Sequence, residues 1–140
     1  METGGEVTAL FTGVMRLARR MRAERPKHVV SSGQLSVLGL LIRHGPLTPG
    51  ALALMDSVHP QSMTRVLAAL DRDGLVTRTK GDDDRRQVIV EITARGRAVA
   101  ARDMAQRREW LAHAMDEALT PTERRLLGLA AELMEKLADV

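Results

Sequence analysis

The chain has 140 residues, of which 44% are hydrophobic and 28% charged, the composition of one globular domain with a substantial core. It contains no cysteine, which excludes disulfides, thiolate metal sites and cysteine redox switches. Phe11 and Trp110 are its only Phe, Trp or Tyr residues, which argues against a single-strand binder that stacks bases on aromatic rings. The net charge of +3, with six basic residues between positions 16 and 27, permits an anionic partner without requiring one.

No apolar stretch is long enough to span a bilayer, and the first residues lack the basic start and long apolar run of a signal peptide. We therefore expect a cytoplasmic protein without a membrane partner. The sequence also lacks a Gly-rich phosphate loop, a nucleophile elbow and a metal-binding helix motif. No catalytic residue, cofactor or enzyme activity is expected.

Two amphipathic helices are expected in the first third of the chain. Apolar residues from Val7 to Met21 recur at helical spacing, which predicts a first helix that ends before Pro26. A second helix is expected from its N-cap, Ser32, to the breaker sequence "HGP" at 44–46. The residues expected on its buried face are Leu35, Leu38, Leu41 and Ile42.

Two shorter helices follow, joined by a tight turn. In "TPGALALM", Thr48 is the expected N-cap and Pro49 the first helical residue. In "HPQSMTRVLAALDRDG", a helix is expected to begin at Pro60 and to end at Gly74. The residues expected to face inward are Met63, Val66, Leu67 and Leu70.

After Gly74 the apolar pattern changes from helical to alternating spacing. "LVTRTK" and "QVIVEI" predict two strands, and residues 81–86 are expected to join them into a β-hairpin. Thr93 is the expected cap of a long helix over 94–118, and "TPTE" at 120–123 is a capping box that starts a last helix. The residues expected on the buried face of that helix are Leu126, Leu127, Ala130, Leu133, Met134 and Leu137.

The resulting order is α-α-α-α-β-β-α-α in a single domain, 1–140, mainly α with a small β-hairpin wing. Residues 32–93 are expected to form a winged helix-turn-helix lobe that binds DNA. Apolar stripes in 5–28 and 94–140 have no evident partner inside that lobe. We therefore expect these helices to form a dimerisation layer against each other and against a second chain.

The helix that begins at Pro60 presents a polar face suited to DNA. Glutamine can pair bidentately with adenine and arginine with guanine, and the free N–H groups of a helix N-terminus attract phosphate. His59, just before this helix, is expected to cap it or to face DNA. The alternative is an ordinary solvated face, but in a helix-turn-helix we favour DNA contact. The residues expected to make it are Gln61, Ser62, Thr64 and Arg65.

The hairpin loop "GDDDRR" places opposed charges at the tip of the wing. Arg85 and Arg86 suit the narrow, electronegative minor groove, and Asp84 can orient an arginine through charge-assisted hydrogen bonds. The alternative is a hard-cation site formed by Asp82, Asp83 and Asp84. Adjacent carboxylates point apart, the ligand spacing of a calcium loop is absent, and the four histidines form no i, i+4 pair, so we expect no metal site.

Two features allow more than one interpretation. The basic run at 16–27 suits contact with DNA flanks, but it is more typical of the wet face of a helix. Phe11 and Trp110 are the only rings that could stack on a ligand, and Met15 could fill the core or line an adaptable pocket. Phe11, Met15 and Trp110 are therefore the candidate ligand-binding residues.

Three segments, "SSGQLSVLGLL", "SMTRVLAALDRDGLVTR" and "DDDRRQVIVEITARGRA", resemble in order and spacing the MarR family of bacterial winged-helix regulators. The similarity covers residues 7–138. It implies a homodimer that binds a pseudo-palindromic operator, usually as a repressor. In many members a small, often phenolic, effector releases the DNA by binding between the dimerisation layer and the DNA-binding lobe, so the resemblance also implies a small-molecule partner.

By matching position, the resemblance implies that Arg86 enters the minor groove with Asp84 as its companion, and that Arg85 contacts phosphate. It also implies backbone contacts by Ser32 and Gln34. The residues that it places on the recognition helix are Gln61, Ser62, Thr64 and Arg65.

The chain also departs from the family pattern. Gly50 and Ala51 replace a common acidic-Leu-Ala sequence, and Pro60 replaces a polar residue. The scarcity of aromatic residues weakens the expectation of a phenolic ligand, and the absence of cysteine excludes the family's peroxide-sensing chemistry.

The leading interpretation is a homodimeric, sequence-specific regulator of transcription that binds double-stranded DNA. Two alternatives stay open. One is a metal-responsive winged-helix sensor that binds a cation through His and Asp residues across the dimer. The other is a protein-interaction dimer that no longer binds DNA, against which the joint presence of Arg65, Arg85 and Arg86 argues.

Overall fold

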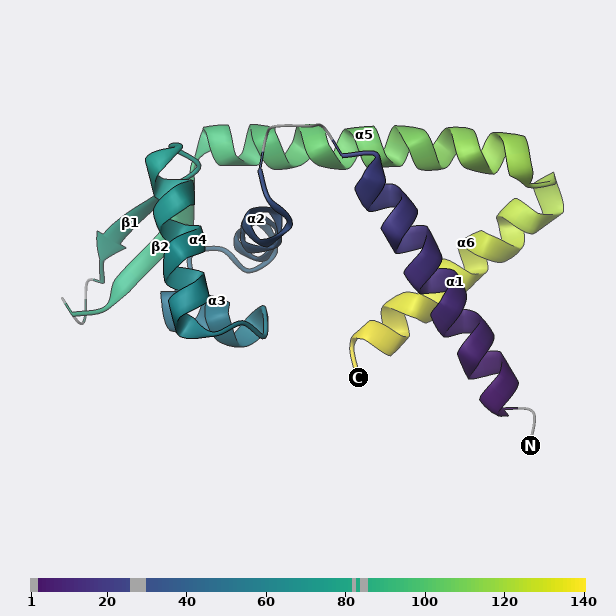
Figure 1. Ribbon diagram of the computed structural model, residues 1–140, viewed down its shortest axis with the longest axis horizontal. Coiled ribbons are helices and arrows are strands. Elements are labelled where there is room, and N and C mark those ends of the chain that lie inside the picture. Colours follow the sequence, from purple (N-terminus) through teal and green to yellow (C-terminus); the bar gives the residue numbers. More distant parts are fainter. Residues whose placement is uncertain (1–2, 26–29, 82, 84–85) are drawn as a thin grey trace. The chain divides into compact units, whose positions relative to one another are not determined.

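The computed structural model describes residues 3–25, 30–81, 83 and 86–140. The predicted mainly helical order with a hairpin is confirmed. The elements are α1 (Thr3–Ala23), α2 (Ser32–His44), α3 (Pro49–Met55), α4 (Pro60–Arg72), β1 (Val76–Lys80), β2 (Val88–Ile92), α5 (Ala94–Ala118) and α6 (Pro121–Ala138) (Figure 1). The chain divides into a winged-helix unit, Pro26–Met104, and a helical unit, Met1–Arg25 with Ala105–Val140.

The winged-helix unit has an apolar core to which α2, α3, α4 and the hairpin all contribute. Leu38, Leu52 and Leu70 are each 0% exposed, and burying a side chain of this size contributes about 1.5–3 kcal/mol. The other buried apolar residues are Val37, Leu41, Ala53, Met63, Leu67, Leu75, Val76, Val90 and Ala100. The predicted inward face of α4 is confirmed. Met63, Leu67 and Leu70 belong to this core, and Val66 is partly buried against it.

The N-cap of α2 is Ser31 and not the predicted Ser32. Its hydroxyl accepts a hydrogen bond from the Gln34 N–H (3.2 Å), and the Gln34 side-chain oxygen accepts one from the Ser31 N–H (2.8 Å). This reciprocal capping box needs a spacing of three residues, which only Ser31 has from Gln34. The predicted burial of Ile42 is also wrong, because its side chain is 44% exposed and Val37 occupies the core instead.

The helix-turn-helix consists of α3 and α4. The Ala51 N–H donates to the Thr48 hydroxyl (3.1 Å), which caps α3 as predicted. In the turn between the helices Ser57 has φ +53°, a left-handed conformation that costs a non-glycine residue roughly 1–2 kcal/mol. The Ser36 hydroxyl donates to the Asp56 carboxylate and so ties α2 to the end of α3.

The hairpin is fixed to the helix-turn-helix through its backbone. β1 and β2 pair in antiparallel register from Val76 opposite Ile92 to Lys80 opposite Val88. Leu47, just before α3, exchanges two backbone hydrogen bonds with Val90, at 3.1 and 2.8 Å. The direction of the wing is therefore set by the same segment that starts α3.

The first turn of α5 packs closely on the turn between α4 and β1. The Thr93 hydroxyl accepts from the Gly96 N–H (3.0 Å), as predicted for a cap, and donates to the Gly74 carbonyl (2.7 Å). A Cβ atom on Gly96 would lie 2.2 Å from the Leu75 carbonyl oxygen. Glycine is therefore required at this position for the helix to approach so closely.

In the helical unit, α6 begins with the predicted capping box. The Thr120 N–H donates to the Glu123 carboxylate (2.7 Å), and the Glu123 N–H donates to the Thr120 hydroxyl (3.3 Å). Neither α1 nor α6 contains a buried residue in the single chain. The large apolar side chains that α6 leaves exposed are Leu126, Leu127, Leu129, Leu133, Met134 and Leu137. Within the described residues, no helix has the length and apolarity needed to cross a membrane.

Candidate nucleic-acid interface

α4 divides its residues between the core and the solvent. Met63, Leu67 and Leu70 recur at helical spacing and are buried, which fixes how the helix is rotated on the winged-helix unit. The opposite face of its first two turns is polar, and all of its members are exposed. The polar residues that the structure brings together on this face are Gln61, Ser62, Thr64 and Arg65.

These side chains have different hydrogen-bonding groups to offer. The Thr64 hydroxyl donates to the Pro60 carbonyl (3.0 Å), so its oxygen can act toward a ligand as an acceptor. Arg65 has no ion pair with any residue in the described part of the chain, and its guanidinium has five N–H donors. The face therefore offers both donors and acceptors, as the reading of base edges requires.

His59 and Gln34, two predicted contacts, hold positions at helix starts. His59 is the N-cap residue of α4 by its backbone, but its side chain makes no capping bond and is exposed. Gln34 uses its side-chain oxygen in the capping box of α2, which leaves the NH2 group for other contacts. Ser32 is an exposed residue in the first turn of α2.

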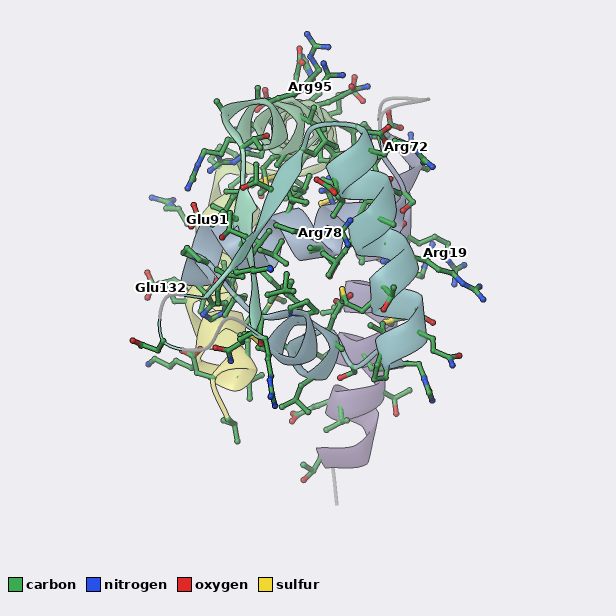
Figure 2. The ribbon with its side chains drawn as sticks, turned by 90° about the vertical axis from the view of Figure 1, so that its left-hand side faces the viewer. Arg19, Arg72, Arg78, Glu91, Arg95 and Glu132 are labelled. Atoms are coloured by element: carbon green, nitrogen blue, oxygen red, sulfur yellow. The ribbon has the colours of Figure 1, made fainter. Side chains whose placement is uncertain are left out.

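A pair of opposite charges joins α4 to the wing. Arg78 on β1 donates to one carboxylate oxygen of Asp71, in the last turn of α4, from Nε (3.2 Å) and Nη2 (2.8 Å). Figure 2 shows Arg78 on the hairpin beside α4. Both side chains keep more than a third of their surface exposed, so the ion pair stabilises the fold only weakly. The pair does, however, join the last turn of α4 to the first strand of the wing.

The sequence alone did not single out Asp71 or Arg78, although an acidic residue at the end of a helix was an available signal because it opposes the helix dipole. At the wing tip, Arg86 is exposed. Next to it in the chain, the Gln87 carbonyl accepts a hydrogen bond from the Gly81 N–H (2.7 Å). The predicted contacts Asp84 and Arg85, and Asp82 of the alternative cation site, lie outside the described residues.

The candidate ligand-binding residues all belong to the helical unit. Trp110 is half-buried and lines a pocket between α1 and α5, whereas Phe11 (65% exposed) and Met15 (43% exposed) do not line it. Among the residues that the structure describes, no three His, Asp or Glu side chains gather as metal ligands.

Comparisons with known proteins agree with this geometry. The family model described as "MarR family" matches residues 30–88, which include all of α2, α3, α4 and β1. The HTH-type transcriptional regulator MT0903.1 of Mycobacterium tuberculosis is 42% identical over 130 residues, 93% of this chain and 90% of its own length. The HTH-type transcriptional repressor YetL of Bacillus subtilis is 34% identical over 71 residues, 49% of this chain and 42% of its own length.

The similarity to known proteins also includes a solved structure that matches this chain over its full length. A crystal structure of a Pseudomonas aeruginosa PA01 protein assigned as a transcriptional regulator superposes with a TM-score of 0.87 and 32% sequence identity. The match covers 100% of this chain and 98% of the other. This chain is therefore similar to such proteins in its helical unit as well as in its winged-helix unit.

Proposed function

Because the chain belongs to the MarR family of transcriptional regulators, we propose that it is a homodimeric repressor that binds a pseudo-palindromic operator in double-stranded DNA. The family makes it a transcriptional regulator and not an enzyme. Support for repression comes from its similarity to YetL, which is named a repressor. In this proposal residues 32–93 are the DNA-binding lobe, and 5–28 with 94–140 are the dimerisation layer.

The observation that carries the proposal is the polar face at the start of α4. Gln61 and Arg65 are exposed in its first two turns, where the N-terminal N–H groups also favour phosphate. With α4 in the major groove, Gln61 and Arg65 read base edges, while Ser62, Thr64 and His59 contact bases or phosphates. Arg86 enters the flanking minor groove, and Ser32 and Gln34 contact the backbone.

Support for the homodimer comes from the apolar surface of the helical unit. Every large apolar residue of α1 between Val7 and Leu17 keeps at least 39% of its surface exposed in the single chain. The large apolar residues of α6 keep at least 37% of their surface exposed, and a monomeric protein rarely leaves so large an apolar surface in water. A second copy related by a two-fold axis buries the stripes on both chains, and half-sites about 10 base pairs apart follow from that symmetry.

DNA binding by single variants tests the proposal. We expect Gln61→Ala and Arg65→Ala to reduce the preference for operator over random duplex, by about 1–3 kcal/mol each, with little change on random DNA. Arg86→Ala should weaken binding to both duplexes. It should also reduce the slope of the logarithm of the binding constant against the logarithm of the salt concentration by about one. The measurement is fluorescence anisotropy of both duplexes over a range of salt concentrations.

Arg72→Ala is the matched control, because Arg72 is an exposed arginine at the other end of α4 that lies near Asp73 (3.8 Å). It should change operator preference less than Arg65→Ala does. Equal losses for all four variants on both duplexes would contradict the proposed division between base reading and backbone contact.

A further inference from the structure

A shallow pocket lies on the first turns of α5, within the winged-helix unit. Its volume is about 280 Å³, and it is lined by Arg95, Arg102, Ala98 and Val99. Residues three, four and seven apart lie on one face of a helix, so the two short side chains leave the space between the two arginines open. All four are exposed except Val99, which packs partly against the core.

The surface around this pocket is basic. Residues 94–104 of α5 include three arginines, all of them exposed, whereas their one acidic residue, Asp103, is 2% exposed. Within the described part of the chain, neither Arg95 nor Arg102 is ion-paired with a carboxylate. These two residues, the α5 arginine pair, can therefore offer both charges to an anionic partner.

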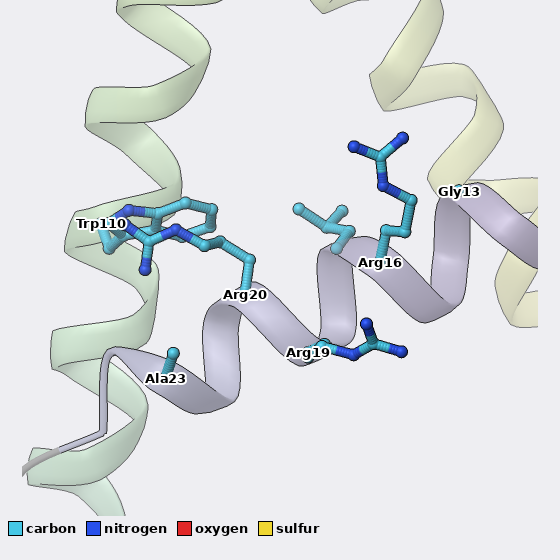
Figure 3. A pocket seen from close by; sticks show the side chains of 7 residues that line it. Gly13, Arg16, Arg19, Arg20, Ala23 and Trp110 are labelled. Atoms are coloured by element: carbon cyan, nitrogen blue, oxygen red, sulfur yellow. The ribbon is translucent and has the colours of Figure 1, made fainter.

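Other arginines of the chain already have partners. Arg20 of the helical unit is ion-paired with Glu24, and its guanidinium lies 4.9 Å from the centre of the Trp110 ring (Figure 3). Arg78 of the wing donates to Asp71. In both cases a carboxylate compensates the charge, and the α5 arginine pair differs from them in this respect.

The α5 arginine pair lies away from the polar face that reads bases in the proposed function. The Cδ atom of Arg95 is 4.0 Å from the place that a Cβ atom would take on Gly74, in the turn after α4. α4 has 13 residues, so this turn is about 18 Å from the start of the helix at Pro60. Figure 2 shows Arg95 at the same end of α4 as Arg72. The pair is therefore a second basic surface, separate from the reading face.

We infer that the α5 arginine pair binds phosphate groups of the DNA that flanks the operator. Each guanidinium can form fork-like, charge-assisted hydrogen bonds with a phosphate. Seven residues advance about 10.5 Å along a helix, and three phosphate steps advance about 10 Å along one DNA strand, so the spacing of the pair matches that of the backbone. Ala98 and Val99 leave room for the sugars between those phosphates.

Flanking DNA is the partner that the molecule itself brings to this surface. A duplex held by α4 continues past the half-site, so its phosphates are present near the same unit at a high local concentration. An acidic protein could pair with the same charges, but it has no such tether. The inference rests on the proposed function, because flanking DNA is held there only when the operator is bound.

Operator affinity on two duplexes tests the inference. One duplex ends at the two half-sites, and the other carries the same operator with ~20 base pairs of unrelated sequence, about two helical turns, on each side. The wild type should bind the longer duplex about ten-fold more tightly, and the slope of the logarithm of its binding constant against that of the salt concentration should be steeper by about two for each protomer. Fluorescence anisotropy over a range of salt concentrations measures both quantities.

The double variant Arg95→Gln/Arg102→Gln should lose this gain. It should bind the shorter duplex within about two-fold of the wild type, which also shows that it is folded. Arg97→Gln is the matched control, since Arg97 is an exposed arginine of the same segment that does not line the pocket. That variant should keep the gain from flanking DNA.

The inference is overturned if flanking DNA gives the wild type no gain, or if Arg97→Gln loses as much of the gain as the double variant does. It is also overturned if the double variant keeps the gain, which would leave the pair to an acidic protein, or loses affinity equally on both duplexes. The shorter duplex separates this inference from the proposed function. Without a preference for operator over random sequence there, the proposed function fails; with that preference but no gain from flanking DNA, only the inference fails.

Discussion

Gly96 decides how closely α5 approaches the helix-turn-helix. A methyl group at this position would meet the Leu75 carbonyl oxygen at 2.2 Å and the Ile92 side chain at 2.8 Å. The first of these contacts is with backbone, which cannot move aside as a flexible side chain can. The conformational freedom of glycine is not the reason for its presence here; the reason is the absence of a side chain.

We predict that Gly96→Ala lowers the free energy of unfolding by at least about 2 kcal/mol, because the added atom forces α5 away from the turn. Gly39→Ala is the matched control: Gly39 lies inside α2 with nothing within 4 Å of its missing Cβ. That substitution should stabilise the protein by about 0.5–1 kcal/mol. Urea denaturation at equal protein concentration measures both, and equal effects would contradict the close packing at Gly96.

At the scale of elements, the Asp71–Arg78 ion pair links α4 to β1 of the wing, the two elements that contact the DNA grooves in the proposed function. An acidic residue near DNA normally weakens binding by repelling phosphate, so its removal should strengthen binding. If Asp71 instead holds Arg78 and the wing in place, its removal should weaken binding. The two roles of this carboxylate therefore predict opposite signs.

We predict that Asp71→Asn weakens operator binding by roughly two- to five-fold, the size expected from losing an exposed ion pair. Asp73→Asn is the control, because Asp73 lies two residues away and its contact with Arg72 (3.8 Å) is within α4 and its cap. It should leave affinity unchanged or increase it slightly. Tighter operator binding by Asp71→Asn in anisotropy titrations would show that the pair does not position the wing.

The capping box of α6 gives this helix a dependence on pH. The hydrogen bond from the Thr120 backbone N–H, and then the one with the Thr120 side chain, lower the pKa of Glu123 below its ordinary value of 4.5. Because the folded-state pKa is the lower one, the stabilising effect is complete above that ordinary value. It is lost as the pH falls through the lowered pKa.

We predict that Glu123→Gln removes this dependence, since a glutamine can complete the same box, as Gln34 does in α2. The stability of the wild type relative to the variant should be constant above pH 4.5 and should fall below it. Thermal denaturation of both proteins between pH 3 and 7 tests this. A difference that does not change with pH would mean that the Glu123 carboxylate contributes nothing as a charged group.

The elements were largely predictable because their boundaries depend on local chemistry. Thr48 with Pro49, and Thr120 with Glu123, marked helix starts by residue type and spacing alone. Ser31 was missed in favour of Ser32, although its spacing from Gln34 is the one that a capping box needs. The exposure of Ile42 and the choice of Arg78 as the partner of Asp71 depend on which elements pack together in three dimensions, and no local pattern gives that.

At the scale of the whole molecule, the apolar side chains of α1 and α6 account for the expected dimer. Leu133, near the middle of α6, is 58% exposed in the single chain. A charge placed there is harmless in a monomer, but it is buried without a partner in a dimer that covers this helix. The free-energy cost applies twice, because a two-fold axis buries the same residue on both copies.

We predict that Leu133→Glu weakens dimerisation at least about 100-fold, since burying an unpaired charge costs about 3–5 kcal/mol. Leu54→Glu is the control, because Leu54 is 82% exposed but lies in α3 of the winged-helix unit. That variant should sediment as the wild type does. Sedimentation velocity over a dilution series measures the dissociation, and an unchanged profile for Leu133→Glu would exclude α6 from the interface.

Selection of binding sites from random double-stranded DNA at a fixed, moderate salt concentration tests the central claim most directly. A two-fold dimer that reads DNA through α4 should recover an inverted repeat whose half-sites lie about 10 base pairs apart, centre to centre. The same selection with Arg65→Ala should return a motif with weaker preference at one position in each half-site. Recovery of no motif, or of a single half-site without symmetry, would contradict a dimeric, sequence-specific regulator.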